Sequence, residues 1–391
     1  MFVLVVSNLY PPDVLGGYEL LAQDIVTTLA GRGHRVEVLT TRTDASQGTE
    51  TVTRTLRLAR PFGSAPGSDR LRHLLAYGVN RAATRRLLRE RGLPDVALIM
   101  SLRRLGLAPL RGLQEAGVAT VVTVNDDWPL AYAKRSGAGV RSAVEAVLFA
   151  YKTWDTGDVS EVVYLSDAVR RAVWGAGVLF PSGTVLPQGV DLRRFAPRLL
   201  RPVAAAPELL FVGRLHPSKA PEVALEALAV LRGRGLDAHL RMAGEADDVG
   251  YLRALRALAD ELGVAAQVEW LGKVAREELP DVYSQADVLL FASRLAHEGQ
   301  GLTYLEAMAS GVAVVAYPSG GALEFLDRFT DAVGRPRELT GECFADEVMQ
   351  LYCDEGLTAR RVEAGLRVVR EHGSLETYGQ ALEAILQRVT R

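Results

Sequence analysis

The sequence predicts an α/β protein built from two doubly wound parallel sheets, each covered by helices on both faces. Three observations lead to this prediction. At 391 residues, the chain is longer than one hydrophobic core usually supports, so two domains are expected. Short apolar runs alternate with amphipathic stretches, in the strand-helix-strand order that is typical of parallel sheets. The alternation stops over residues 186–207, which contain four prolines, and then starts again.

The first half opens with a strand at residues 2–6 and a helix at residues 14–30. Apolar side chains recur there at four-residue spacing, as on one face of a helix. Further strands are expected over residues 35–40, 96–100, 120–124 and 162–165.

The second half repeats the pattern, with strands at residues 209–212, 238–242, 268–271, 288–291 and 312–316. Helices are expected at residues 221–232, 251–262, 280–284 and 302–309. A last helix at 375–389 has no strand after it and could pack on either domain. We therefore place an N-terminal domain at residues 1–200, a C-terminal domain at 201–372 and a C-terminal helix at 373–391, which could pack back on the first domain.

The composition excludes several classes of protein. Hydrophobic residues make up 48% and charged residues 24%, as in soluble globular proteins, and the net charge of -2 does not favour nucleic acid. Cys343 and Cys353 lack a CxxC or Cys/His pattern, which disfavours a structural disulfide or zinc site. No run approaches the ~20 apolar residues of a membrane span, and no basic leader precedes the first strand. We expect a cytoplasmic protein.

The strongest local pattern covers residues 297–311, His-Glu-Gly-Gln-Gly-Leu-Thr-Tyr-Leu-Glu-Ala-Met-Ala-Ser-Gly. Gly299 and Gly301 allow the backbone to approach a ligand, and the helix that starts near Leu302 directs free N–H groups at it. Glu298 and Glu306 can each accept hydrogen bonds from paired hydroxyls, so a polyhydroxylated ligand fits. The alternative is a capped helix with two solvated glutamates.

Two other loops follow predicted strands. Gly213 allows a tight exit from its strand, and the two cations Arg214 and Lys219 suit a diphosphate, although exposed basic loops are common. Gly16 and Gly17 lie at the N-terminus of a predicted helix and form a plausible phosphate-facing turn. This turn lacks the GxGxxG pattern, so a nicotinamide enzyme is disfavoured.

Together these loops resemble the GT4 family of retaining glycosyltransferases, which have the GT-B fold, and the similarity covers nearly the whole chain. The family pattern of two glutamates with seven residues between them, with an EAMA-type helix, matches residues 298–311 closely. The other matching elements are Gly213-Arg214 with Lys219, Gly16-Gly17, Gly189-Val190-Asp191, and Gly320-Gly321 with Glu324.

The resemblance implies transfer of a hexose-type sugar from a nucleotide diphosphate sugar, UDP- or GDP-linked, to a small-molecule, glycan or lipid-linked acceptor. Arg214 and Lys219 would stabilise the leaving diphosphate, Glu306 would bind the ribose, and Glu298 the transferred sugar. The remaining donor-binding candidates are Gly299, Gln300, Gly301 and Leu302 at the sugar or phosphate, and Gly272, Lys273 and Val274 at the base. Neither a cofactor nor a metal is implied, because the two cations do the work of a divalent ion.

One departure from the family concerns Asn125, which stands where a histidine is common. Asparagine cannot take a proton at neutral pH, so a general base is excluded here, but a role in holding the donor sugar or the reacting oxygens remains. Gln188 is a second departure, in place of the usual asparagine. The alternative interpretation is a catalytically silent or non-transferase GT-B relative that binds a sugar nucleotide. Asn125 is the only feature that supports it.

Residues 70–91 form a basic amphipathic segment with seven arginines. Such a helix can dock on anionic lipid, which would suit a lipid-linked acceptor and place the protein peripherally at the inner membrane face. The alternative is a solvated helix face, which we favour because arginine is common throughout this chain.

Overall fold

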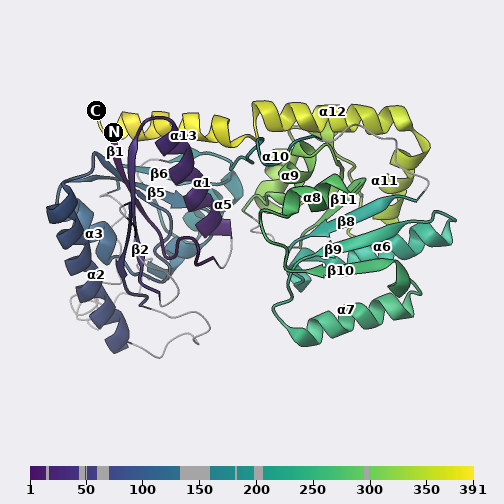
Figure 1. Ribbon diagram of the computed structural model, residues 1–391, viewed down its shortest axis with the longest axis horizontal. Coiled ribbons are helices and arrows are strands. Elements are labelled where there is room, and N and C mark those ends of the chain that lie inside the picture. The colour runs from purple at the N-terminus through teal and green to yellow at the C-terminus, as the bar shows by residue number, and fades with distance from the viewer. Residues whose placement is uncertain are drawn as a thin grey trace. The chain divides into compact units, whose positions relative to one another are not determined.

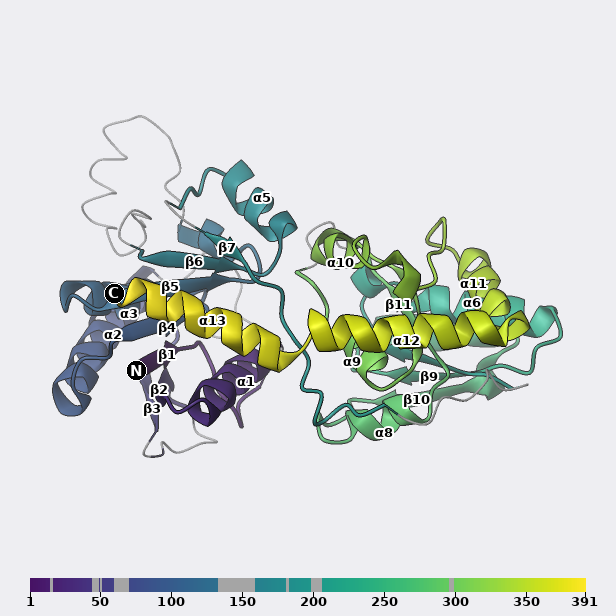
Figure 2. The ribbon, with the colours of Figure 1, turned by 90° about the horizontal axis from the view of Figure 1, so that it is seen from above.

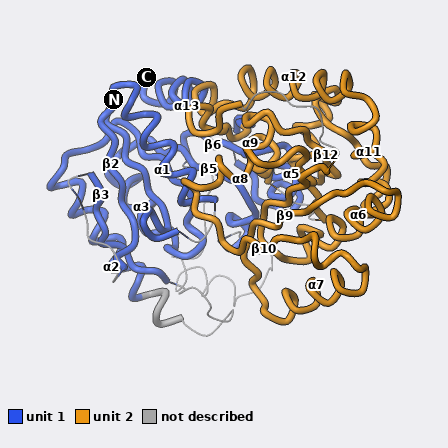
Figure 3. Tube along the Cα trace, turned by 45° about the vertical axis from the view of Figure 1, so that its right-hand side comes forward, with its two compact units in different colours: residues 1–186, 379–391 blue, residues 187–378 orange. Residues whose placement is uncertain are grey.

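The computed structural model describes residues 1–14, 17–43, 49, 51–59, 70–132, 159–180, 183–197, 206–294 and 299–391 (Figure 1). It divides into two compact units, shown in two colours in Figure 3. Unit 1 comprises Met1–Leu186 and Gly379–Arg391, and unit 2 comprises Pro187–Tyr378. No helix in the described part of the chain is both long enough and apolar enough to cross a membrane.

The division between the units precedes the boundary that we predicted at residue 200. The segment after Pro187 joins unit 2 through backbone hydrogen bonds, because Val190 N–H donates to Gly373 O at 2.8 Å and Leu375 N–H donates to Val190 O at 2.9 Å. Phe195 adds a buried aromatic contact, with its ring 5.7 Å from that of Tyr283. The proline-rich stretch therefore begins inside unit 2.

Unit 1 contains a seven-stranded sheet in the order β3-β2-β1-β4-β5-β6-β7, with all pairs parallel. The strands are β1 (Phe2–Val6), β2 (Arg35–Thr41), β3 (Val52–Leu56), β4 (Val96–Ile99), β5 (Ala119–Val124), β6 (Glu161–Tyr164) and β7 (Thr184–Val185). The helices are α1 (Gly17–Gly31), α2 (Arg70–Arg91), α3 (Ala108–Glu115), η1 (Trp128–Tyr132) and α5 (Asp167–Gly175).

Unit 2 contains a five-stranded parallel sheet in the order β10-β9-β8-β11-β12. The strands are β8 (Glu208–Val212), β9 (His239–Ala243), β10 (Val268–Gly272), β11 (Val288–Ala292) and β12 (Ala313–Tyr317). The helices are η3 (Pro217–Lys219), α6 (Pro221–Gly233), α7 (Val249–Glu261), η4 (Ala265–Gln267), α8 (Leu279–Ser284), α9 (Thr303–Ala309), α10 (Gly320–Leu326), η5 (Thr330–Ala332), α11 (Gly341–Cys353) and α12 (Glu355–Glu371).

The apolar core of unit 2 lies on both faces of its sheet. Alternate residues of β8 belong to different clusters: Leu209 and Phe211 pack in one, and Leu210 packs in the other. Successive side chains of a strand point to opposite faces, so both faces of this sheet are covered. The doubly wound α/β fold class that the sequence predicts is confirmed.

The last helix, α13 (Leu375–Val389), follows α12 in Figure 2 and passes from unit 2 into unit 1 at Gly379. Within unit 1, the Glu383 carboxylate accepts a hydrogen bond from Arg32 Nε at 2.6 Å and bonds His34 Nε2 at 2.9 Å. These partners lower the pKa of Glu383, Arg32 being the larger cause. The helix therefore completes the unit to which the N-terminal strand belongs.

Candidate active site

In unit 2, three neighbouring strands end at glycines, which we call the glycine row: Gly213 after β8, Gly244 after β9 and Gly272 in β10. Gly213 N–H donates to Ala243 O at 2.9 Å, and Gly244 N–H donates to Gly272 O at 2.8 Å. A Cβ atom on Gly244 would lie 1.7 Å from Gly213 O, a distance that no side chain permits. Only glycine therefore allows these strand ends to approach each other.

A charged residue follows each member of the glycine row: Arg214, Glu245 and Lys273. Arg214 Nη1 pairs with Asp247 Oδ2 at 2.8 Å, and Lys273 Nζ pairs with Glu245 Oε2 at 3.8 Å. All four side chains are more than half exposed. Ion pairs in such solvated positions contribute less than about 1 kcal/mol, so an anionic ligand can replace the carboxylate partners. Val274 follows Lys273 and packs against the buried core.

Lys219 ends the single turn η3 in the same loop as Arg214. The turn begins at His216, whose Nδ1 accepts a hydrogen bond from Ser218 N–H at 3.2 Å. Lys219 N–H donates to His216 O at 2.8 Å. The loop between β8 and α6 thus carries both predicted diphosphate ligands at the carboxyl end of a central strand.

Glu306 lies on α9 with its side chain almost fully buried. Tyr283 Oη donates a hydrogen bond to Glu306 Oε2 at 2.8 Å. Burial raises the pKa of Tyr283 well above its ordinary value, and the charge of Glu306 raises it further, so the tyrosine is a permanent donor. This contact fixes one carboxylate oxygen. No sequence motif marked Tyr283, because its partner lies 23 positions away.

Gln300 is a buried residue whose side chain binds backbone rather than facing solvent. Its Oε1 accepts from Gln188 N–H at 2.6 Å, and its Nε2 donates to Gln188 O at 3.1 Å. The side chain therefore ties the segment just before α9, which includes Gly301 and Leu302, to the segment after Pro187. Two predicted site residues, Glu298 and Gly16, lie outside the described residues. Gly299 is the first described residue after Glu298.

In unit 1, Asn125 follows β5 and contacts the first turn of α1. Asn125 N–H donates to Tyr18 Oη at 3.0 Å, and Tyr18, which comes directly after Gly17, is hydrogen-bonded to Asp126. Burial raises the pKa of Tyr18 well above its ordinary value, and the charge of Asp126 adds to this. Within the described part of the chain, the buried Nδ2 of Asn125 has no hydrogen-bond partner. It is a donor that a ligand oxygen could satisfy.

Arg103 completes this group of unit 1 side chains. Its guanidinium lies 3.1 Å from Asp126 Oδ1 and also pairs with Asp127. Asp126 is therefore held between a cation and the Tyr18 hydroxyl. Asn125 and Gly17 belong to unit 1, whereas the other described candidates all belong to unit 2.

A buried ion pair that the sequence did not indicate supports the loop after β1. Arg54 Nη1 lies 3.3 Å from Asp13 Oδ2, and Thr43 Oγ1 donates to the same oxygen at 2.7 Å. Arg54 Nη2 also donates to the carbonyls of Tyr10 and Pro11, at 3.1 and 2.6 Å. The backbone of Tyr10 and Pro11 and the side chain of Asp13 are thereby held by β3, which lies on the other side of β2 from β1.

The basic helix α2 buries part of its surface in unit 1. Ala76, Leu87 and Leu88 are buried, whereas Leu75 is exposed. On its polar side, Arg81 and Arg85 both pair with Glu115 of α3, and Arg86 pairs with Glu90. Contact of residues 70–91 with a membrane stays a prediction.

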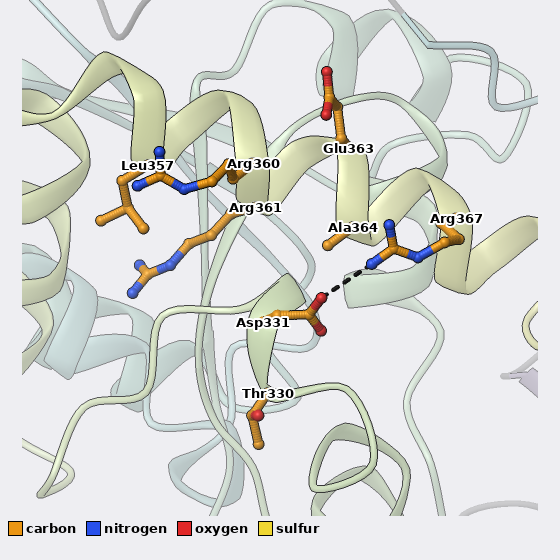
Figure 4. Close-up of a pocket in the computed structure, with 8 residues that line it drawn as sticks. All are labelled: Thr330, Asp331, Leu357, Arg360, Arg361, Glu363, Ala364 and Arg367. Carbon is orange, nitrogen blue, oxygen red and sulfur yellow. Dashed lines mark hydrogen bonds and ion pairs between the residues drawn. The ribbon is translucent and has the colours of Figure 1, made fainter.

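One pocket of unit 2, with a volume of about 450 Å³, lies between η5 and α12 (Figure 4). Arg367 reaches across it to Asp331, with an N–O distance of 3.0 Å. It is lined by Thr330, Asp331, Leu357, Arg360, Arg361, Glu363, Ala364 and Arg367. None of the predicted site residues lines this pocket.

Comparison with protein families gives two matches that together cover most of the chain. The model described as Glycosyltransferase Family 4 matches residues 15–194, and the model described as Glycosyl transferases group 1 matches residues 200–367. The second match includes every described candidate of unit 2, from Gly213 to Glu306. The first includes Gly17 and Asn125.

Among similar proteins, a GDP-mannose-dependent alpha-(1-6)-phosphatidylinositol monomannoside mannosyltransferase of Mycolicibacterium smegmatis is 33% identical over 59% of this chain and 62% of its own length. The protein of the same name from Mycobacterium tuberculosis matches over 46% of its length, so the chain spans less than two thirds of these relatives. A glycogen synthase of Mycobacterium tuberculosis is 27% identical over 93% of this chain and 89% of its own length.

Solved structures show the same fold over almost the entire chain. Anabaena HepE in complex with UDP and glucose superposes with a TM-score of 0.72 at 20% identity, covering 99% of this chain and 100% of HepE. Sucrose-phosphate synthase from Thermosynechococcus elongatus gives 0.74 at 18% identity, covering 99% and 98%. The solved structures show the GT-B fold, and the two family models show that the chain belongs to the family 4 glycosyltransferases.

Proposed function

We propose that this protein transfers a hexose-type sugar from a UDP- or GDP-linked donor to an acceptor, with retention at the anomeric carbon and without a divalent metal. The observation that carries the proposal is the loop between β8 and α6. It presents Arg214, whose described partner is an exposed carboxylate, and Lys219 at the same strand end. Two cations at one strand end suit a diphosphate.

In this reaction the bond between the anomeric carbon and the diphosphate oxygen breaks, and negative charge builds on the leaving diphosphate. Arg214 and Lys219 stabilise that charge from preorganised positions, which is usually a large catalytic contribution. The acceptor oxygen forms the new bond on the same face of the sugar, and its proton passes to the leaving phosphate. No protein base is needed for this step.

Other candidates bind the donor. Glu306, oriented by Tyr283, accepts hydrogen bonds from the ribose hydroxyls, because a carboxylate offers about four acceptor sites and the tyrosine uses one of them. Glu298 binds hydroxyls of the transferred sugar. Gly299, Gln300, Gly301 and Leu302 contribute backbone amides, and Gly272, Lys273 and Val274 lie against the base.

In unit 1, Asn125 acts as a hydrogen-bond donor toward the sugar or the reacting oxygens. Its buried Nδ2, which has no partner in the described part of the chain, supports this role. The acceptor is a small molecule, a glycan or a lipid-linked sugar. The Mycolicibacterium relative is named for a GDP-mannose donor and a phosphatidylinositol-linked acceptor, and HepE was solved with UDP and glucose. These names support both donor classes.

A thermal-shift panel without added metal tests the donor. UDP, GDP, ADP, TDP and their common sugar conjugates are added separately, with EDTA present. Binding to the folded state at a concentration 100-fold above Kd stabilises it by about 2.7 kcal/mol. We expect one nucleotide family to raise the melting temperature, and the Lys219→Ala variant to lose that rise. No rise with any nucleotide would contradict the proposed donor site.

A second candidate function is a catalytically silent protein that binds a sugar nucleotide. The replacement of the family's histidine by Asn125 is the observation that favours it. Donor hydrolysis or transfer separates the two functions. A protein that binds one nucleotide sugar but neither hydrolyses nor transfers it in the presence of varied acceptors would be the silent relative.

A further inference from the structure

The residue after Lys219 has an unfavourable backbone conformation. Ala220 has φ +48°, in the left-handed region, and among the described residues it is the one non-glycine residue with positive φ. The left-handed conformation costs an L-residue about 1–2 kcal/mol. Ala220 is fully buried, and α6 begins directly after it. Strain of this kind persists only where the surrounding structure enforces it, and it is concentrated at functional sites.

Arg294 supplies much of that enforcement. It follows β11, and its backbone N–H donates to Ser218 O at 2.8 Å. Its Nη1 donates to Pro217 O at 3.1 Å and pairs with the carboxylate of Glu222 in the first turn of α6. The side chain and the backbone of Arg294 thus hold two consecutive carbonyls of η3, although Arg294 lies 77 positions after Pro217 in the chain.

The rest of the network fixes Arg294 in turn. Tyr251 Oη of α7 donates to Glu222 Oε2 at 2.9 Å, so the carboxylate that pairs with Arg294 is itself held. At the start of η3, His216 Nδ1 accepts from Ser218 N–H at 3.2 Å. Arg294 and His216 thus contact this single turn directly, Glu222 and Tyr251 hold Arg294, and the turn ends at the predicted cation Lys219.

We propose that Arg294 is a positioning residue that holds η3 so that the Lys219 ammonium meets the donor diphosphate in one fixed place. Lysine has a long flexible stem, so its backbone must be fixed if its charge is to be preorganised. Glu222 neutralises the charge of the Arg294 guanidinium. Arg294 therefore contributes by fixing the geometry of η3 and not by adding positive charge to the site. This inference rests on the proposed function, because it assumes that Lys219 binds a diphosphate.

A double-mutant cycle tests the proposal. Donor turnover is measured for the full-length protein and for the variants Arg294→Gln, Lys219→Ala and the double variant, each with its melting temperature. We expect Arg294→Gln to lower kcat/KM about 10-fold, in line with a misplaced catalytic group. In the Lys219→Ala background the same change should have little further effect, because its target is already absent.

Arg232→Ala provides the matched control. Arg232 also joins a carboxylate and a backbone carbonyl, those of Asp237 at 2.6 Å and Ala238 at 3.3 Å, but it lies at the far end of α6. We expect it to lower the melting temperature without changing kcat/KM. Arg294→Lys keeps the charge but loses the planar geometry, so it should remain impaired. An additive cycle, or wild-type kcat/KM in Arg294→Gln, would overturn the proposal.

Calorimetric binding of nucleoside diphosphate separates this inference from the proposed function. If Lys219→Ala weakens binding and Arg294→Gln does not, Arg294 does not act through Lys219 and the inference fails alone. If neither variant weakens binding, Lys219 does not bind the diphosphate and the proposed donor site fails as well. If both variants weaken binding of the nucleoside diphosphate, and the double variant binds no more weakly than Lys219→Ala, the results support both the proposed donor site and the role of Arg294.

Discussion

Each unit places a tyrosine hydroxyl against a carboxylate, but the surroundings of the two pairs differ. In unit 2, the fully buried Tyr283 bonds Glu306, and the loops after β8 and β9 are shaped by backbone features, namely the glycine row and the strained Ala220. In unit 1, Tyr18 bonds Asp126, which is held by the side chain of Arg103. In unit 2 the strand ends themselves are thus shaped by main-chain contacts, with side chains such as Arg294 holding the loop beyond them, whereas in unit 1 the described contacts are made mainly by side chains.

This difference indicates what each edge can tolerate. Main-chain contacts depend on a few glycines and keep one shape, which suits the part of a ligand that does not vary, such as a diphosphate. Side-chain networks change with single substitutions that leave the fold intact. We therefore expect substitutions in unit 2 to have large effects and those in unit 1 to have moderate ones.

The largest effect should come from the two cations of unit 2. Lys219→Ala or Arg214→Ala should lower turnover by about 100-fold or more, because each removes preorganised charge from the leaving diphosphate. Steady-state kinetics with a saturating donor checks this. Lys273→Ala, which removes an exposed cation of the same edge, is the control and should change turnover only a few-fold. Near-normal turnover in both Lys219→Ala and Arg214→Ala would refute the diphosphate site.

The glycine row should be next in magnitude. Gly244→Ala forces a Cβ atom against Gly213 O, so we expect it to lower the free energy of unfolding by about 2–3 kcal/mol. Gly263→Ala is the control, because Gly263 has φ +70° but no atom lies within 4 Å of the position that a Cβ would take. It should cost about 1 kcal/mol. If urea unfolding gave the same loss of free energy of unfolding for both variants, the close approach of the strand ends would contribute nothing to the cost of Gly244→Ala.

The two tyrosines allow a direct test of the comparison. Tyr283→Phe removes one hydrogen bond from the buried carboxylate of Glu306, and this should raise KM for the nucleotide sugar about 5- to 10-fold with little change in kcat. Tyr18→Phe should have a smaller effect, about 2- to 5-fold, and mainly on kcat, because it supports Asn125. Initial rates over a range of donor concentrations separate the two parameters. A larger effect of Tyr18→Phe than of Tyr283→Phe would contradict the expectation that substitutions in unit 2 have the larger effects.

The smallest predicted effect is the contribution of the two tyrosines to stability at alkaline pH. Burial raises the pKa of Tyr18 and Tyr283 well above 10, whereas both ionise near their ordinary pKa when the chain is unfolded. The folded state therefore binds more protons than the unfolded state above pH 10, and stability falls as pH rises from there through the folded pKa values. At pH 10.5 each tyrosine should account for about 0.8 kcal/mol of loss. Urea unfolding of each Tyr→Phe variant should show a correspondingly weaker pH dependence.

Much of the fold could be predicted because it depends on local periodicity. The strands of unit 2 lie nearly where the apolar runs place them, and α13 has the predicted bounds. Helices α11 and α12 were not predicted, although Phe344, Val348 and Leu351 are buried at helical spacing and would have indicated α11. The alternation of strands and helices does not extend to this region, since none of the described strands lies beyond β12.

The site could be predicted only where residues are adjacent in sequence. Arg214, Lys219 and Glu306 belong to short motifs, so the sequence indicates their loops. The residues that hold them, such as Tyr283 and Arg294, contact partners 23 and 77 positions away. Tyr18 and Asn125 are 107 positions apart. Such pairs are brought together by strand order, and no local pattern in a single chain records them.

The path of α13 has a consequence for the order of assembly. Arg32 and His34 lie at the start of the chain, yet their carboxylate partner is Glu383, which follows Arg32 by 351 positions. Glu161 likewise receives Arg388 Nη2 at 2.6 Å. A ribosome releases the first unit long before it has made these partners. The N-terminal sheet therefore lacks the contacts of α13 until unit 2 has been synthesised, so unit 1 can be completed only after the whole chain has been made.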